Sequence, residues 1–398
     1  MNVYIPGSIA GRPSVIPQNP SPRPNPQPVM TENSLPRGIN YQADYSGCGY
    51  WRMSWPEQVL TSYQHMIVHG LTCMVRDPAF YTNVKAVRLQ RQANPAQLNF
   101  YKHLRSIADQ NNFRLIYEID DVVMREDIPD YNRYKFAFEP DEIRQCVIEM
   151  MNMSDEISVT CDYMRDYYID KTGNKNVSVV PNYIPRFWAD RFYDEDLISR
   201  NYDRHVKKRK KPRILYAGSG AHFDVDNKTG HVDDFTHVRD VIRKTSNKYQ
   251  WVFIGAFPPP LSDLIRSGKI EFHNWTPLYS LPELIKSLKI NCMVAPLLDN
   301  TFNRCKSDIK FVEACAYGLP VVCQDMVTYK QATHKFTTGD DMIDQLKTIL
   351  QDKQQYLKIS RKMRQQVETR WLESSDNIGK YKELYTTSFG SSERKLLK

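Results

Sequence analysis

Lys306 to Val322 read KSDIKFVEACAYGLPVV, and this stretch says most about how the chain folds. Its first part predicts a helix that starts near Ser307, and its last four residues predict a buried strand. The start of a helix offers free backbone amides and the positive end of the helix dipole to an anion. Lys306 and Lys310 are four residues apart and add two positive charges on one helix face. The stretch therefore predicts a site for a diphosphate.

Glu313 lies one turn beyond Lys310 in the same predicted helix. Its carboxylate is suited to accept hydrogen bonds from both hydroxyls of a ribose. A diphosphate next to a ribose is part of a nucleotide, so this helix is a candidate nucleotide site. The alternative is an ordinary surface helix whose charges face water.

A glycine turn supports the nucleotide interpretation. Residues 213–217 predict a strand, and Gly218, Ser219 and Gly220 follow it. Glycines at this position let backbone amides approach a phosphate closely. His222 comes next, either facing a ligand or standing as a solvated loop histidine. Further on, Trp275 could stack on a nucleobase or belong to the core.

Strand-like and helix-like segments alternate on both sides of the glycine turn, which predicts parallel sheets with helices on both faces. The predicted strands of the first half are residues 71–75, 84–89, 115–119, 157–160 and 177–180. Those of the second half are residues 213–217, 251–255, 270–272, 292–296 and 319–323. A helix is predicted from Ser54 to a stop at Gly70. Two doubly wound halves predict an α/β fold of two Rossmann-like domains that face each other across a ligand-binding cleft.

The chain of 398 residues is long enough for two domains. A proline-rich stretch marks its beginning, and the basic run of residues 207–211 interrupts the alternation in the middle. We expect five parts: a proline-rich arm (1–36), an acceptor-binding domain (37–185), a basic linker (186–212), a nucleotide-binding domain (213–370), and a C-terminal helix that packs back towards the first domain, with a tail (371–398).

The composition is that of a globular protein with a net charge of +8, which suits a polyanionic partner such as DNA or an anionic surface. No apolar run approaches the ~20 residues that cross a bilayer, and the N-terminus has no secretory pattern. We therefore expect a cytoplasmic protein. The eight cysteines include no CxxC pair, which indicates buried reduced thiols rather than a zinc site.

Two segments of the first half supply further candidates. Gly47 and Gly49 precede the first helix and permit close backbone approach, and Arg52 follows with a charge that could reach a donor phosphate. Asp120 and Asp121 come at the end of a predicted strand, facing the same cleft, where an acid can orient or deprotonate a hydroxyl. The rival interpretation makes this acid pair a metal site; the two doubly wound halves disfavour it.

The stretch from Lys306 to Val322 resembles the donor-binding segment of GT-B fold glycosyltransferases, in particular the large retaining family four. There a helix carries two acids that are separated by seven residues and precede a Gly-x-Pro-Val-Val strand. Glu313 stands at the second acid, and residues 318–322 read GLPVV. Cys305 occupies the first acid position. The KSxxK pattern of Lys306 to Lys310 resembles phage and bacterial members of the family.

Segments of the first half resemble phage DNA glucosyltransferases. The Gly47-Cys48-Gly49 loop is similar to their early glycine loop. Residues 115–121 are similar to their catalytic strand, with Asp120 at the position of the catalytic acid and Ile119 in place of a histidine.

These resemblances imply a metal-independent enzyme, without a cofactor, that takes a sugar from a nucleotide-diphosphate donor, with a UDP-sugar as the expected donor. They imply an acceptor such as 5-hydroxymethylcytosine in phage DNA, modified with arabinose or glucose, with double-stranded DNA as the partner. A polysaccharide or lipid-linked sugar is the second acceptor class. A DNA-binding or virion-associated protein that keeps the fold without catalysis is a different class of function, and the absent first acid and absent histidine permit it.

Overall fold

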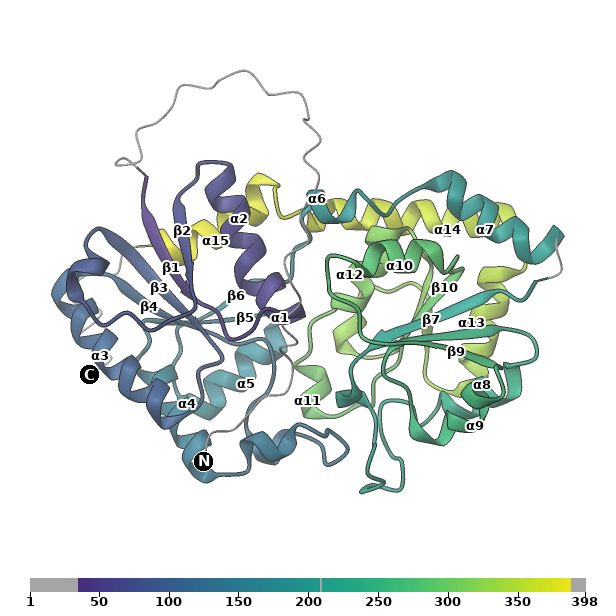
Figure 1. Cartoon of the computed structure of the whole chain (residues 1–398), viewed down its shortest axis with the longest axis horizontal. Helices are drawn as coiled ribbons and strands as arrows, with labels where there is room; N and C mark the ends of the chain where they lie inside the picture. The colour runs from purple at the N-terminus through teal and green to yellow at the C-terminus, as the bar shows by residue number, and fades with distance from the viewer. Residues whose placement is uncertain (1–34, 208–209, 388–398) are drawn as a thin grey trace, which may run out of the picture. The chain divides into compact units, whose positions relative to one another are not determined.

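The computed structural model describes residues 35–207 and 210–387. These residues form two parallel six-stranded sheets, one in each half of the chain (Figure 1). The proline-rich arm predicted for residues 1–36 lies outside the described residues up to position 34, as do Lys208 and Arg209 of the basic run and residues 388–398 of the tail.

The first sheet has the strand order β2-β1-β3-β4-β5-β6, and every neighbouring pair is parallel. Helices α3 to α5 lie along one face of this sheet, and α2 lies on the other (Figure 1). The strands are β1 (Arg37–Tyr41), β2 (Ile67–Leu71), β3 (Val84–Gln90), β4 (Arg114–Glu118), β5 (Glu156–Val159) and β6 (Val177–Val179); the helices are α1 (Gly47–Gly49), α2 (Trp55–Ser62), α3 (Pro95–Asn111), α4 (Asp141–Met153) and α5 (Asp162–Thr172).

The second sheet has the order β12-β11-β10-β7-β8-β9 and is also parallel throughout. Its strands are β7 (Arg213–Gly218), β8 (Gln250–Gly255), β9 (Ile270–His273), β10 (Cys292–Ala295), β11 (Val321–Gln324) and β12 (Lys335–Phe336); its helices are α8 (Arg239–Thr245), α9 (Ser262–Arg266), α10 (Leu281–Ser287), α11 (Thr301–Arg304), α12 (Ile309–Tyr317), α13 (Gly339–Leu350) and α14 (Lys353–Gln366). The predicted α/β fold with two doubly wound sheets is confirmed.

The stretch from Lys306 to Val322 folds as the sequence predicts, with a small shift at its start. Helix α12 begins at Ile309 and ends at Tyr317, and it is capped by Gly318, whose φ of 63° is left-handed and suits glycine. Strand β11 follows at once and is buried beside β10. Since Lys306 precedes the first helical residue, the prediction that Lys306 and Lys310 share a helix face is wrong.

Three local predictions differ from the structure. Helix α2 ends at Ser62, and Gly70 lies inside β2 rather than closing the helix, because residues 67–71 pair with β1. The predicted strand of residues 71–75 is therefore placed four residues too late. Strands β1 and β12 were not predicted, since one follows the proline-rich arm and the other has two residues.

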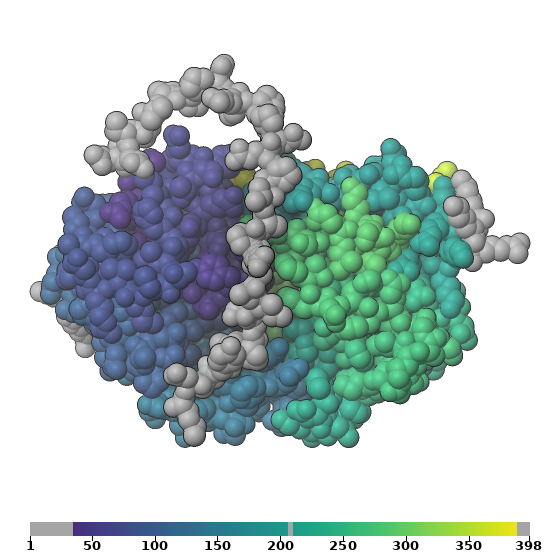
Figure 2. Space-filling model, in the orientation of Figure 1, coloured from purple at the N-terminus to yellow at the C-terminus, as the bar shows by residue number. Residues whose placement is uncertain are grey.

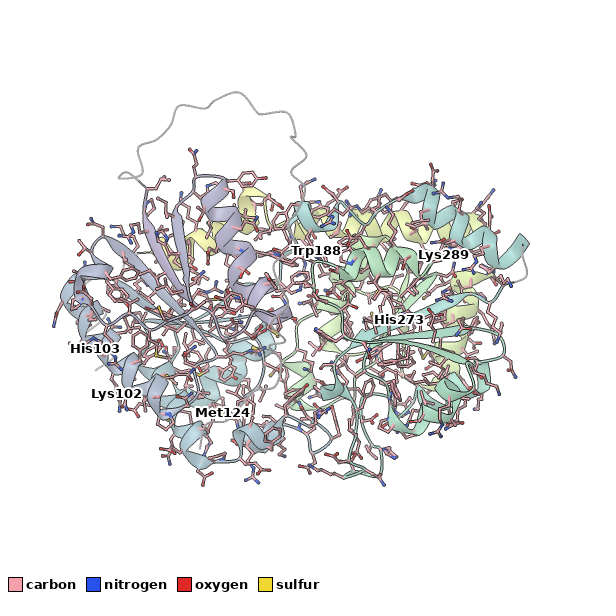
Figure 3. All side chains as sticks on the ribbon, in the orientation of Figure 1. Lys102, His103, Met124, Trp188, His273 and Lys289 are labelled. Atoms are coloured by element: carbon pink, nitrogen blue, oxygen red, sulfur yellow. The ribbon has the colours of Figure 1, made fainter. Side chains whose placement is uncertain are left out.

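The segment predicted as a basic linker contains two helices, α6 (Arg186–Ala189) and α7 (Glu195–Lys207). Trp188 of α6 is fully buried (Figure 3) and its ring lies 6.1 Å from that of Trp51, 5.2 Å from that of Trp55 and 6.2 Å from that of Tyr317. Its indole N–H donates to the carbonyl of Leu278 at 3.1 Å. Large aromatic rings bury much apolar area, so this cluster ties residues of both halves into one core.

The last described helix, α15 (Ser375–Thr386), packs against β3 and α2 of the first half. The carbonyl of Leu384 accepts a hydrogen bond from Arg114 at 2.9 Å, and the Tyr385 hydroxyl donates to Asn40 at 2.5 Å. Purple and blue residues of the first half and teal and green residues of the second form two continuous surfaces in the space-filling view (Figure 2). The last described helix therefore packs on the first half of the chain.

Of the eight cysteines, Cys146, Cys292, Cys305, Cys315 and Cys323 are buried free thiols, as predicted. Cys73 is exposed, and Cys48 and Cys161 are only partly buried, which corrects that expectation for three positions. No helix of the described residues is long and apolar enough to cross a membrane.

Candidate active site

A small cavity of about 130 Å³ collects side chains from both halves of the chain. Its polar lining combines three cations, two acids and a histidine, and a tryptophan and a tyrosine add apolar surface. The lining residues are Cys48, Trp51, Arg91, Asp120, Asp121, Asn182, His222, Leu297, Lys306, Ser307, Ile309, Lys310 and Tyr329.

The sheet topology explains why these residues meet. Arg91 directly follows β3, Asp120 follows β4, and Asn182 follows β6; His222 comes after β7 and Leu297 after β10. In parallel sheets the carboxyl ends of the strands share one edge, and ligands bind in the crevice outside that edge. The cavity therefore lies where a doubly wound fold places its ligand.

Arg91 holds Asp120 in place. The guanidinium Nε donates to Asp120 Oδ1 at 2.5 Å, and both side chains are mostly buried. Burial raises the pKa of Asp120, but the charge and hydrogen bond of Arg91, helped by Arg52, outweigh it and leave the pKa below its usual value. Asp120 is therefore a carboxylate at neutral pH.

Asp121 is the more accessible of the two acids, with a side chain that is 32% exposed. Its Oδ1 lies 3.7 Å from Nζ of Lys306, whose ammonium group also stands 4.2 Å from the centre of the Phe302 ring. Asp121 thus keeps a face open to a second ligand in the cavity.

Lys310 and Glu313 share a poorly solvated place on α12. Nζ of Lys310 donates to the carbonyl of Ala217 at 2.8 Å and lies over the ring of Tyr216. Burial lowers the pKa of Lys310 to about 8; the charge of Glu313 opposes this shift and that of Lys306 adds to it. Burial likewise raises the pKa of Glu313 to about 7, against the attraction of Lys310. Both groups would gain from a ligand that hydrogen-bonds their charged forms.

His222 is buried at the cavity wall and is not a solvated loop residue. Its Nδ1 lies 2.6 Å from Oδ2 of Asp234, a carboxylate with a side chain that is 1% exposed. Burial is the largest cause of a lowered pKa for His222, and the charges of Lys310 and Lys306 add to it, while Asp234 opposes it.

Arg52 does not reach the cavity, which corrects the prediction that it contacts a donor phosphate. The side chain is 0% exposed and donates from Nε to Glu118 at 2.6 Å and from Nη1 to the carbonyl of Val180 and to Asn182. Asn182 in turn donates to the Ser307 hydroxyl at 2.9 Å. Arg52 therefore supports the cavity wall from behind.

Gly49 has a role in the fold itself, whereas the predicted close approach of Gly47 to a ligand stays a prediction. A Cβ on Gly49 would lie 1.8 Å from the carbonyl oxygen of Asp44, so glycine is required there by the chain's own turn. Around Gly47 there is open space. Cys48, between them, is the residue that lines the cavity.

A second hollow of about 480 Å³ adjoins the glycine turn. Ser219 and Gly220 line one side, and Trp275, which is 60% exposed, lines the other. The core interpretation of Trp275 is therefore wrong. Gly218 contributes its carbonyl oxygen, which would meet a Cβ on Gly255 at 2.6 Å; Gly255 has a φ of 93°.

Sequence reasoning missed Arg91, Cys48, Asn182 and Asp234. The signal for Arg91 was present, because it comes two residues after the predicted strand 84–89 and strand ends point to the cleft. Asp234 had no such signal, since only the folded loop brings it to His222. In residues 35–207 and 210–387 no three His, Cys, Asp or Glu side chains are grouped to hold a metal ion.

The two sheets and the cleft at their strand ends define the class: the chain has a GT-B fold. No protein-family model matches the chain, and neither does any curated protein. Among solved structures, HepE from Anabaena in complex with UDP-glucose has a TM-score of 0.58 at 10% identity, covering 88% of this chain and 100% of that one. A point mutant of S. aureus TarM, in complex with Fondaparinux, alpha-GlcNAc-glycerol and UDP, has a TM-score of 0.50 at 11% identity, covering 76% and 55%. At these identities the likeness shows the fold.

Proposed function

We propose that this protein is a glycosyltransferase that takes a sugar from a nucleotide-diphosphate donor, with UDP as the nucleotide. The observation that carries the proposal is the cavity in which Arg91, Lys306 and Lys310 meet the acids Asp120 and Asp121 at the strand ends of both sheets. A cationic wall facing a carboxylate wall suits a reaction in which a diphosphate leaves and a hydroxyl attacks.

The donor diphosphate binds to Lys306, Lys310, Ser307 and the amides at the start of α12. These positive groups stabilise the charge that builds on the diphosphate as the bond to the sugar breaks. Glu313 accepts the ribose hydroxyls, which offsets the cost of keeping its carboxylate charged in a buried place. Solved complexes of HepE with UDP and UDP-glucose support UDP as the nucleotide.

The nucleobase enters the hollow between the glycine turn and Trp275. The backbone of Ser219 and Gly220 permits close approach, and the exposed indole of Trp275 offers a stacking surface. A stacking ring must be accessible before the ligand arrives, and Trp275 meets that condition.

The two acids have different roles in the reaction, one on the acceptor and the other on the transferred sugar. Asp121 orients the acceptor hydroxyl and accepts its proton, because it is the more exposed acid. Asp120, fixed by Arg91, keeps a negative charge beside the transferred sugar, where positive charge develops. This mechanism uses positive charges of the chain and calls for no cofactor.

For the acceptor we propose the hydroxymethyl group of 5-hydroxymethylcytosine in double-stranded DNA, with glucose or arabinose as the sugar. The net charge of +8 supports a polyanionic acceptor. A groove of about 580 Å³ beside the hollow adds five basic side chains (Arg125, Arg133, Lys135, Arg144 and Lys228), although four acids share its lining. A polysaccharide or lipid-linked sugar is the competing acceptor.

Thermal shift with UDP-, GDP- and dTDP-glucose tests the donor. We expect stabilisation by UDP-glucose that Lys310→Ala and Glu313→Ala each abolish. Stabilisation that survives in both variants would place the donor elsewhere. Slow hydrolysis of the stabilising donor without acceptor separates an enzyme from a non-catalytic DNA-binding protein with the same fold.

Transfer of radiolabelled glucose or arabinose tests the acceptor. A duplex containing 5-hydroxymethylcytosine should become labelled, while the same duplex with cytosine should not. Label that instead enters an oligosaccharide or a lipid-linked sugar would overturn the DNA acceptor and leave the donor proposal standing.

A further inference from the structure

We propose that His222 binds the donor diphosphate as an imidazolium held by Asp234, so that donor binding brings one proton to this ring. The inference rests on the proposed donor site, since it needs a diphosphate in the cavity. It assigns a donor-binding role with a stated charge to a residue that the sequence left open between a ligand-facing and a solvated position.

The geometry starts from a carboxylate that is held from several sides. Asp234 Oδ1 accepts hydrogen bonds from the Tyr131 hydroxyl at 2.8 Å, the Leu298 amide at 2.9 Å and the Asn303 side-chain amide at 2.7 Å. Only Oδ2 is left for His222, at 2.6 Å. Because three donors fix Oδ1, the carboxylate cannot turn, and the imidazole is oriented by a rigid partner.

The same contacts decide the tautomer. A carboxylate oxygen accepts, so Nδ1 of the ring carries the hydrogen and the neutral imidazole keeps its lone pair on Nε2. Asp234 lies outside the cavity lining, whereas His222 belongs to it. The ring edge opposite Nδ1, which bears Nε2, is therefore the edge that faces the cavity.

The groups around the ring make the protonation state depend on the ligand. Tyr216 of β7 presents its ring at 6.3 Å, and the ammonium groups of Lys306 and Lys310 share the cavity. Burial and these two positive charges hold the pKa of His222 below its usual value, against the pull of Asp234. Without a ligand the ring is neutral at pH 7.

The acids across the cavity do not compensate the two lysines fully. Asp120 is engaged by Arg91 at 2.5 Å, and Asp121 stands 3.7 Å from Lys306. A diphosphate brings two negative charges into this space and offsets the lysines. The ring then stands between the Asp234 carboxylate and an anion, which is the arrangement that favours imidazolium.

The linkage has a definite sign. A group whose pKa is raised by binding favours binding at low pH, and this gain is lost as the pH rises through the pKa of the bound state. Lys310 and Glu313 titrate in the same range, with pKa values of about 8 and 7. A proton count on the whole protein therefore mixes three groups, and the test must observe His222 itself.

The experiment is a side-chain ¹⁵N NMR spectrum of the full chain with labelled histidine, recorded at pH 7 without ligand and with the probes UDP-, GDP- and dTDP-glucose. These sugars esterify the terminal phosphate and have no titrating phosphate near neutrality, so that any proton taken up belongs to the protein. The His222→Gln variant assigns the signal. We expect a neutral ring protonated on Nδ1 in the free protein and an imidazolium in the complex.

Affinity gives the second readout. Between pH 6.5 and 8 the Kd of the bound probe should change with pH more gently in His222→Gln than in wild type, and at pH 6.5 the variant should bind at least tenfold more weakly. His103→Gln is the matched control: this histidine of α3, in the first half (Figure 3), contacts the carbonyl of Arg76 and should behave as wild type.

Two outcomes overturn the inference and are distinguishable. If a probe binds and the His222 ring stays neutral, the donor site stands and the role of His222 is refuted. If none of the three probes binds the wild-type protein at any pH in this range, the proposed function fails, and this inference fails with it. Melting temperatures of the variants identify any that do not fold, and His222→Asn then replaces His222→Gln.

Discussion

Arg91 and Asp120 form a close ion pair at the floor of the cavity, with Nε 2.5 Å from Oδ1. Arg91 has a φ of 47°, a left-handed conformation that is uncommon for arginine. Residues held in such conformations concentrate at functional sites. The backbone amide of Arg91 donates to the carbonyl of Glu118 at 3.0 Å, which ties the end of β3 to the end of β4 and aims the guanidinium at the acid.

Replacing Arg91 by methionine should change the pH dependence of catalysis. Arg91 is the main cause that keeps the pKa of Asp120 low against burial. Without Arg91 the pKa of Asp120 rises. As the pH is lowered, Asp120 in the variant therefore becomes protonated, and activity is lost, at a higher pH than in the wild-type protein. We expect the acidic limb of the kcat/KM profile to move up by about one pH unit or more. An acidic limb that stays in place would show that Asp120 does not control the rate; Arg76→Met, at a surface site away from the cavity, is the control.

Lys310 lowers the stability of the folded protein, although the proposed donor binding needs it. The pKa of Lys310 in the folded protein is about 8, below the ordinary value of 10.5. Burying the charged form therefore destabilises the folded state fully below pH 8, and this destabilisation disappears as the pH rises from 8 to 10.5. Lys310→Met should therefore raise the Tm at pH 7 by about 2 °C or more, although it removes the hydrogen bond to Ala217. The gain should shrink above pH 8.

The same variant should no longer be stabilised by UDP-glucose. The loss of Lys310 does not leave Glu313 as a buried charge without a partner. Its pKa is already about 7, so that Glu313 can take up a proton when Lys310 is absent. Scanning calorimetry at pH 7 and pH 10, with and without the ligand, measures both effects. A variant that is less stable at pH 7 would contradict the buried-charge argument, whatever happens to donor binding.

The sequence was sufficient for the parts of the fold that repeat a strong local pattern. Apolar runs between turn residues located most strands, and the GLPVV segment located the end of α12 and the start of β11. Strand β12 has two residues and no pattern of its own. The boundary between α2 and β2 was missed because Ile67 continues a helical pattern but pairs with Arg37, a partner thirty residues away.

The site was predictable to the extent that strand ends could be recognised. Asp120 follows a clear strand, Lys306 precedes a clear helix and Lys310 lies in the first turn of that helix, and the three do meet. Arg52 was misplaced because burial cannot be read from a charge: its partners Glu118 and Val180 are distant in the sequence. The Asp234 contact of His222 depends on how the loop after β7 closes, which no spacing rule predicts.

A substitution of Arg52 tests whether this residue supports the fold and does not contact the donor phosphate. Its guanidinium and that of Arg88 both pair with Glu118 in a fully buried cluster. Arg52→Met removes one partner of a buried ion pair and should lower the free energy of unfolding by about 3 kcal/mol, as measured by urea denaturation. The folded protein should still bind UDP-glucose within about threefold of wild type. An affinity loss of a hundredfold with unchanged stability would restore Arg52 to the donor site.

Substitution of Trp275 should have the opposite effects to Arg52→Met: the stability should hardly change, and donor binding should weaken. Its side chain is 60% exposed, so Trp275→Ala removes little buried surface and should change the free energy of unfolding by less than about 0.5 kcal/mol. If the indole stacks on the nucleobase, the loss of stacking costs about 1–3 kcal/mol, and the affinity for UDP-glucose falls roughly 5-fold to 150-fold. Trp275→Phe keeps a stacking ring and should recover most of that loss. Equal affinities of the Trp275→Ala and wild-type proteins for UDP-glucose would show that the nucleobase does not bind in this hollow, because stacking is the only contact with the ligand proposed for this exposed indole.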